Sequence, residues 1–267
     1  MARDARDLPS ALDSWERIAA RLGGRRPVLF LDYDGTLTPI VSQPEDAVLS
    51  EEMRETLRRL AALCTVAIVS GRDRGDVEPL VGLERLVYAG SHGFDIKGPD
   101  GLRMEHEGGR QALPALEDAE AALTEKLAGV EGSRVERKRF AIAVHYRNVA
   151  ESDVRYVANV VEEVARGHAT LRVSGGKKVF ELRPALDWDK GRAVLWLMDA
   201  LNLNEGEVEP FYLGDDVTDE DAFRAIADRG VGIVVGLPSH ATVARYALPD
   251  TDSVRRFLQR MIERLGA

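Results

Sequence analysis

Two carboxylates separated by one residue are the first feature of this sequence with clear chemical potential. Asp32 and Asp34 follow Val28–Leu31, a run that is apolar at every position and is typical of a buried strand in a parallel sheet. Side chains two positions apart point the same way, so we expect both carboxylates to converge where the strand ends. Such a pair repels itself unless a cation or a proton lies between the groups. The spacing predicts a divalent metal site, acid–base chemistry or both, although Asp-Gly is also an ordinary turn sequence.

Three further segments place polar side chains at the ends of predicted strands or at the start of a helix. Ser70 follows a second apolar run, and Asp215 and Asp216 follow a later one. Lys190 falls in the first turn of a helix that opens at Asp189, where the helix dipole disfavours a cation unless an anion lies opposite. Strands and helices in this alternation form right-handed crossover units, so the strand ends meet at the sheet edge where ligands bind. Each segment alone has a purely structural explanation, but together they favour a catalytic site.

Composition limits the class of protein. Of 267 residues, 45% are hydrophobic and 30% are charged, which suffices for a large core. The net charge of −9 argues against a nucleic-acid partner, and no apolar run is long enough to span a membrane. Cys64 is the only cysteine and lies in an apolar run, which favours a buried structural thiol. The charged N-terminus does not resemble a signal peptide. We therefore expect a monomeric cytoplasmic enzyme that acts on a small molecule.

The hydrophobic pattern changes near Leu113 and changes back after Pro184. Outside these points, buried strands alternate with amphipathic helices, which predicts an α/β fold with a Rossmann-like parallel sheet. Between them the pattern predicts a smaller α/β domain with two helices and alternating strands. We assign residues 1–110 and 186–267 to the two halves of the core and residues 111–185 to the insert.

Several local elements follow from caps and periodicity. We expect a helix over residues 8–22, single strands over 85–96 and 133–149, and helix caps at Ser50, Ser152 and Thr218. Thr218 and Asp221 have the spacing of a capping box.

At this point the sequence resembles a known superfamily. DYDGTL, SGR, DKG and GDDVTDED, which begin at residues 32, 70, 189 and 214, look like the four signature motifs of the haloacid dehalogenase superfamily of phosphohydrolases. The stretches GSHGFDI, VERKRFAIAVHYRNV and GKKVFELRP are similar to those of trehalose-6-phosphate phosphatases. The resemblance implies a haloacid dehalogenase core with an inserted cap domain, and it covers nearly the whole chain.

The resemblance also implies catalytic roles. Asp32 would attack phosphorus to form an aspartyl-phosphate, and Asp34 would act as the general acid and base. Mg²⁺ would be held by Asp32, Asp215 and the backbone carbonyl of Asp34. Ser70 and Lys190 would bind phosphoryl oxygens, because positioning and charge neutralisation dominate this chemistry. Either Asp216 or Asp219 would support the metal or Lys190, and the sequence leaves both open.

The cap would read the sugar of trehalose 6-phosphate through Arg147, Lys177 and Glu181, which suit hydroxyl groups. Gly71, Arg72 and His92 would contact the substrate from the core, although His92 also suits a structural role. One alternative is another sugar-phosphate phosphatase of this superfamily, acting on sucrose phosphate or a hexose phosphate. A different class is a non-enzymatic receiver-like signalling domain, which the D-x-D pair and the insert disfavour.

Overall fold

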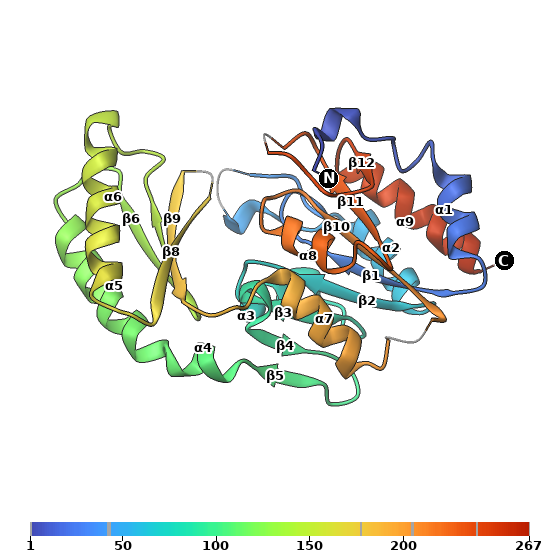
Figure 1. Cartoon of the computed structure of the whole chain (residues 1–267), viewed down its shortest axis with the longest axis horizontal. Coiled ribbons are helices and arrows are strands. Elements are labelled where there is room, and N and C mark those ends of the chain that lie inside the picture. Colours follow the sequence, from blue (N-terminus) through green and yellow to red (C-terminus); the bar gives the residue numbers. More distant parts are fainter. Residues whose placement is uncertain (1, 42–43, 177, 204–205, 239, 267) are drawn as a thin grey trace. The chain divides into compact units, whose positions relative to one another are not determined.

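The apolar run before Asp32 becomes β1 (Arg26–Leu31), a central strand of an eight-stranded sheet in the computed structural model (Figure 1). The strand order is β12-β11-β10-β1-β2-β3-β4-β5, and neighbouring strands from β12 to β3 are parallel. The chain crosses to β2 on one side of β1 and later to β10 on the other. The carboxyl ends of β1 and β10 therefore form a topological switch point, where α/β proteins bind ligands. The other strands are β2 (Thr65–Val69), β3 (Val87–Gly90), β4 (Asp95–Lys97), β5 (Arg103–Glu105), β10 (Val208–Gly214), β11 (Val231–Val235) and β12 (Tyr246–Leu248).

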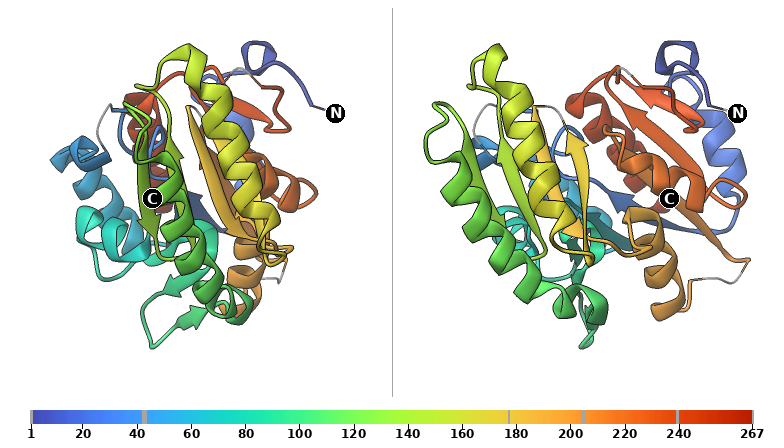
Figure 2. Two further views of the ribbon diagram at one scale, coloured as in Figure 1. Left: turned by 90° about the vertical axis from the view of Figure 1, so that its left-hand side faces the viewer. Right: turned by 60° about the vertical axis from the view of Figure 1, so that its left-hand side comes forward.

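Helices cover both faces of this sheet (Figure 2). On one face, four helices share a buried apolar cluster with alternate strand residues such as Leu29 and Phe211. On the other face, the ring of Tyr212 in β10 meets Phe223 of α8 edge to face, with centroids 5.6 Å apart. The first group is α1 (Trp15–Leu22), α2 (Glu51–Ala61), α3 (Arg74–Val81) and α9 (Thr251–Leu265), and the second is α7 (Lys190–Ala200) and α8 (Asp219–Ala225).

The structure describes residues 2–41, 44–176, 178–203, 206–238 and 240–266. It divides into a core, Met1–Arg103 with Trp188–Ala267, and an insert, Met104–Asp187. The insert thus begins at Met104 rather than at residue 111. Its first helix, α4 (Glu107–Gln111), packs close to Leu186, since a Cβ at Gly108 would lie 2.9 Å from Cδ1 of that leucine.

The insert contains a four-stranded antiparallel sheet of order β6-β7-β9-β8. Two helices bury their apolar sides against one face, where Ile142, Val144 and Leu182 lie. The strand expected over 133–149 is instead a hairpin of two strands, whose turn at residues 139–140 contains none of the Gly, Pro, Asn or Asp residues that usually signal a turn. The elements are α5 (Leu113–Leu127), β6 (Arg134–Lys138), β7 (Ala141–His145), α6 (Glu151–Arg166), β8 (Leu171–Gly176) and β9 (Val179–Pro184).

Two predictions about the core elements are wrong. The helix expected over 8–22 begins only at Trp15, because the preceding segment runs beside β12, where the amide of Ala11 donates to the carbonyl of Ala247 at 2.9 Å. The strand expected over 85–96 reverses at a short 3₁₀ turn, η3 (Ser91–Gly93). Ser91, His92 and Gly93 have φ angles of 50°, 57° and 90°, so β4 returns antiparallel to β3. Two further 3₁₀ turns are η1 (Ala5–Asp7) and η2 (Pro44–Asp46).

Caps were predicted with mixed success. Ser50 caps α2 by accepting from the amide of Met53 at 3.2 Å, as expected. Ser152 lies inside the first turn of α6 rather than before it, and the N-cap is Ala150. Thr218 is the N-cap of α8 but makes no side-chain capping bond, because its backbone is already helical. Within the described ranges, no helix is both long enough and apolar enough to cross a membrane.

Candidate active site

Asp32 and Lys190 form a buried ion pair at the carboxyl end of β1. The amide of Asp32 still donates to the carbonyl of Leu213 in the neighbouring strand, which fixes its backbone. Lys190 opens α7, because Asp189 caps that helix by accepting from the amide of Arg192 at 2.8 Å. Its Nζ lies 2.8 Å from Oδ1 of Asp32, and the two side chains are 3% and 6% exposed. The anion expected opposite the lysine is therefore this carboxylate.

Asp219, the first residue of α8, is a second carboxylate that pairs with Lys190. Its Oδ1 accepts from Lys190 Nζ at 2.7 Å and from the hydroxyl of Tyr212 at 2.7 Å. Its Oδ2 accepts from the backbone amides of Asp215 and Asp216 at 3.0 and 2.9 Å. Four donors occupy the roughly four lone-pair positions of a carboxylate. Asp219 thus orients the lysine and the turn after β10, whereas Asp216 is exposed and contributes its amide.

Asp32, Asp215 and Asp219 bring one carboxylate oxygen each within 4.8 Å of the others. Burial, and secondly the charge of Asp219, raises the pKa of Asp215 to about 7. Burial also raises the pKa of Asp32 well above its ordinary value, although Lys190 opposes this. Clustered hard oxygen donors whose ionised forms repel one another fit a divalent cation such as Mg²⁺. Asp215 lies directly over the turn after β1, where a Cβ at Gly35 would come within 2.1 Å of Oδ2.

Burial and the carboxylate of Asp219 together raise the pKa of Tyr212 well above its ordinary value. Its hydroxyl therefore stays protonated and donates. Burial alone would lower the pKa of Lys190, but Asp219 and Asp32 overcome burial and raise it, so the ammonium stays charged.

Asp34 has different surroundings from Asp32. Both oxygens of its half-exposed carboxylate accept from Arg72, with Nε to Oδ2 and Nη2 to Oδ1 each at 2.7 Å. Strand alternation predicts that the carboxylates of Asp32 and Asp34 converge, but the two share no partner in these contacts. The reason is that β1 ends at Leu31 and the chain turns at Gly35, whose φ is 77°. Arg72, predicted to bind substrate, thus holds the predicted acid–base residue.

The Ser70–Arg72 loop is joined to the turn that carries His92. Ser70 is 1% exposed, its Oγ accepts from the amide of Arg72 at 3.1 Å, and its carbonyl accepts from the amide of His92 at 2.8 Å. The His92 ring lies against Gly71, since a Cβ there would come within 2.9 Å of Cε1. The Ser70–Arg72 loop and the turn that carries His92 therefore hold each other in place. Gly71 has no side chain, which leaves the space that the histidine ring occupies.

Glu181, one of the predicted sugar-binding residues of the insert, lies on the second face of its sheet. Glu181 pairs in register with Ala143, on the face opposite the apolar cluster, and its Oε1 accepts from Lys138 Nζ at 3.2 Å. Arg147 is exposed in the turn after β7. Lys177 lies outside the described residues. His145 also points to this face and lies 2.7 Å from Glu136.

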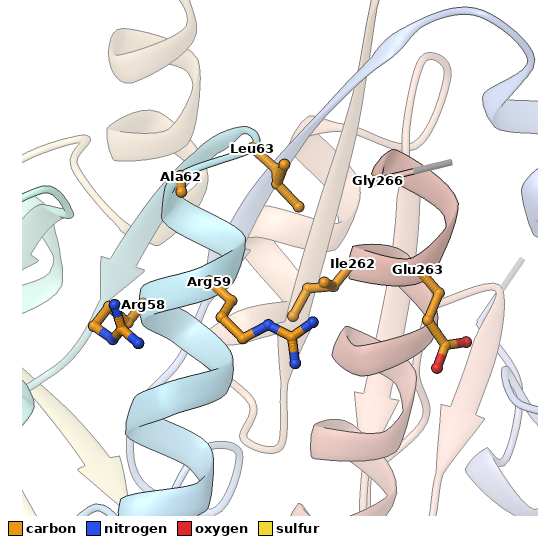
Figure 3. Close-up of a pocket in the computed structure, with 7 residues that line it drawn as sticks. All are labelled: Arg58, Arg59, Ala62, Leu63, Ile262, Glu263 and Gly266. Carbon is orange, nitrogen blue, oxygen red and sulfur yellow. The ribbon is translucent and has the colours of Figure 1, made fainter.

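A surface hollow of about 500 Å³ in the core lies between the last turns of α2 and α9 (Figure 3). Helices that follow parallel strands run back along them, so these last turns mark the opposite edge of the sheet from Asp32. The guanidinium of Arg59 lies between the two helices in this view. The lining residues are Arg58, Arg59, Ala62, Leu63, Ile262, Glu263 and Gly266.

Comparison with known proteins identifies the family. The trehalose-phosphatase family model matches residues 30–252. A probable trehalose-phosphate phosphatase of Oryza sativa is 45% identical over 278 aligned residues, which cover 95% of this chain and 74% of the relative. The chain belongs to the trehalose-phosphatase family. The receiver-like signalling domain is therefore excluded as an alternative.

Solved structures agree with this family at the level of the fold. The C-terminal domain of the Candida albicans trehalose-6-phosphate phosphatase has a TM-score of 0.81 at 23% identity, covering 96% of this chain and 99% of that domain. A haloacid dehalogenase-like hydrolase from Bacteroides thetaiotaomicron has a TM-score of 0.64 at 16% identity, covering 89% and 100%. The predicted fold class, a haloacid dehalogenase-like α/β core with an inserted α/β unit, is confirmed.

Two residues of the site were missed or left undecided by sequence reasoning. The sequence pattern places Tyr212 in an apolar strand, and its hydrogen bond to Asp219 has no sequence signal of its own. The sequence does not distinguish Asp219 from Asp216, whereas in the structure Asp219, at the first residue of α8, accepts from both amides of the turn.

Proposed function

We propose that this chain hydrolyses trehalose 6-phosphate to trehalose and inorganic phosphate. The observation that supports it most is the buried arrangement of Asp32, Lys190 and Asp219 in a member of the trehalose-phosphatase family. Such a site can hold a phosphoryl group against a carboxylate while a fixed ammonium neutralises charge. The family relationship supplies the substrate, which the core geometry alone does not specify.

In the proposed reaction, an oxygen of Asp32 attacks phosphorus, the bond to the sugar oxygen breaks, and an aspartyl-phosphate forms. Asp34 gives a proton to the leaving sugar oxygen and then takes one from the water that hydrolyses the acyl phosphate. Lys190 and Ser70 bind the phosphoryl oxygens, and Asp219 keeps Lys190 in place. These roles follow the predicted ones, with Arg72 added as the partner that orients Asp34.

The carboxylate cluster fits Mg²⁺, with Asp32, Asp215 and the backbone carbonyl of Asp34 as the residues that would hold it. Asp219 is a poorer ligand, because its two oxygens already accept four hydrogen bonds. When bound, the ion supplies positive charge that lets an anionic nucleophile approach an anionic phosphate.

The sugar is assigned to the polar face of the insert. Glu181 and Arg147, with Lys177, would bind hydroxyl groups, and Gly71, Arg72 and His92 would contact the substrate from the core. The ion pair Lys138–Glu181 and the hydrogen bond between His145 and Glu136 hold side chains ready for such contacts. A sucrose- or hexose-phosphate phosphatase would need the same core but a different insert face.

The test is phosphate release from trehalose 6-phosphate, sucrose 6-phosphate and glucose 6-phosphate, with Mg²⁺ and then with EDTA. We expect trehalose 6-phosphate to lead by orders of magnitude and EDTA to stop the reaction. Equal cleavage of all three would contradict the assignment of the insert. Absence of cleavage of any would contradict the proposed function.

A further inference from the structure

The ring of Tyr212 packs among apolar side chains of the core, but it carries a hydroxyl. Its side chain is fully buried, lies beside Phe30 in the parallel register of β1 and β10, and meets Phe223 edge to face. A phenylalanine would fill the same space. A buried hydroxyl lowers stability unless it is hydrogen bonded, and this one donates to Oδ1 of Asp219 at 2.7 Å. The hydroxyl of Tyr212 therefore contributes a hydrogen bond to Asp219 and is not needed for the packing of the ring.

Asp219 shares that oxygen between Tyr212 and Lys190. Lys190 in turn lies between two carboxylates at nearly equal distances, 2.7 Å from Asp219 and 2.8 Å from Asp32. Removing the hydroxyl leaves the ammonium as the sole donor to Oδ1. The uncompensated charge on this oxygen then attracts Lys190 more strongly and draws it away from Asp32. The balance between the two carboxylates thus depends on the tyrosine.

We propose that Tyr212 is a positioning residue: its hydrogen bond to Asp219 keeps Lys190 in reach of Asp32 and holds the turn that carries Asp215. This inference rests on the proposed function for its catalytic consequence, but its structural consequence extends to the metal-binding carboxylates. Removing a residue that hydrogen bonds to a metal ligand or to a reacting group commonly lowers the metal affinity or the rate about 10- to 100-fold.

The test compares Tyr212→Phe with Tyr88→Phe, which is a matched control. Tyr88 lies in β3 of the same sheet, is 2% exposed, and donates its hydroxyl to the carbonyl of Leu83 at 2.7 Å, outside the candidate site. Four quantities are measured on each variant and the wild type: the constants kcat and KM for trehalose 6-phosphate at saturating Mg²⁺, the Mg²⁺ dissociation constant by titration calorimetry, and Tm.

We expect both variants to lose a similar, small amount of thermal stability. Tyr212→Phe should lower kcat about 10- to 100-fold with KM nearly unchanged, and should weaken Mg²⁺ binding, while Tyr88→Phe leaves all three constants at wild-type values. If the wild type turns over and Tyr212→Phe matches its kcat, the inference is wrong. If the wild type does not turn over, the proposed function fails, and the Mg²⁺ titration alone decides the inference: equal affinity in Tyr212→Phe and wild type overturns it.

Discussion

Arg72 holds Asp34 through two parallel hydrogen bonds, Nε to Oδ2 and Nη2 to Oδ1, each 2.7 Å long. The guanidinium also lies 5.4 Å from the centre of the Tyr33 ring, so it is fixed on a second side. A planar fork of this kind restricts the carboxylate to one orientation, which a single point charge does not do.

Arg72→Lys should therefore lower kcat/KM for trehalose 6-phosphate by about 10- to 100-fold, because the charge is kept but the fork is lost. The matched control is Arg58→Lys. Arg58 makes a similar fork with Glu55, at 2.8 and 2.7 Å, on the exposed side of α2. It should leave kcat/KM unchanged. Equal activity in the two variants would show that the arginine fork does not orient Asp34.

The metal-free protein should become less stable as pH rises from about 4 to about 7. Burial and Asp219 raise the pKa of Asp215 in the folded state to about 7 from its ordinary value of 3.8, so the folded state keeps a proton that the unfolded chain has released. The contribution of the protonated Asp215 to stability is largest at a pH below its pKa in the unfolded chain. This contribution is lost as the pH rises through its pKa in the folded protein. The readout is Tm in EDTA across this range for wild type and Asp215→Asn.

Asp215→Asn should show a shallower fall of Tm than the wild type, and Mg²⁺ should flatten the wild-type curve by binding the ionised carboxylates. Parallel curves of Tm against pH for wild type and variant would contradict the claim that Asp215 has a raised pKa in the folded protein.

Glu209 anchors the N-terminal helix from the amino end of β10, far from the catalytic edge. It is fully buried, and its two oxygens lie 2.5 Å from Arg21 Nε and Arg25 Nη1. Glu209→Gln should reduce the free energy of unfolding by about 1–3 kcal/mol, because the hydrogen bond from Arg21 loses its charge and the ion pair with Arg25 is lost, while both arginines can still reach water. Urea denaturation measures this, and Glu55→Gln, at an exposed pair, should cost less than about 0.5 kcal/mol. A loss of kcat in Glu209→Gln would show that this end of the sheet is coupled to the site.

Cys64 should react slowly with a thiol reagent in the folded protein at pH 8. Burial raises the pKa of its thiol to about 12, so the reactive thiolate is scarce. The absorbance change with a disulfide reagent should be slow in buffer and fast in urea. Rapid reaction of the folded protein would mean that the apolar surroundings of Cys64 open readily.

The elements that position the site were predictable where local signals dominate. The buried run before Asp32, the cap at Ser50 and the placement of Lys190 at the start of a helix all follow from periodicity and capping. The different partners of Asp32 and Asp34 were not, because they depend on where β1 ends and on a left-handed turn at Gly35. The bond from Tyr212 to Asp219 joins a strand to the helix after it, and a hydrophobic pattern treats that tyrosine as apolar.

The most direct test of the account is whether Asp32 carries the phosphoryl group during turnover. Wild type and Asp32→Asn would be mixed with trehalose 6-phosphate and Mg²⁺, quenched in acid within milliseconds, and digested for mass spectrometry. The account predicts one phosphoryl group on the wild-type peptide that contains Asp32, and neither adduct nor phosphate release in Asp32→Asn. Steady phosphate release by Asp32→Asn would contradict it.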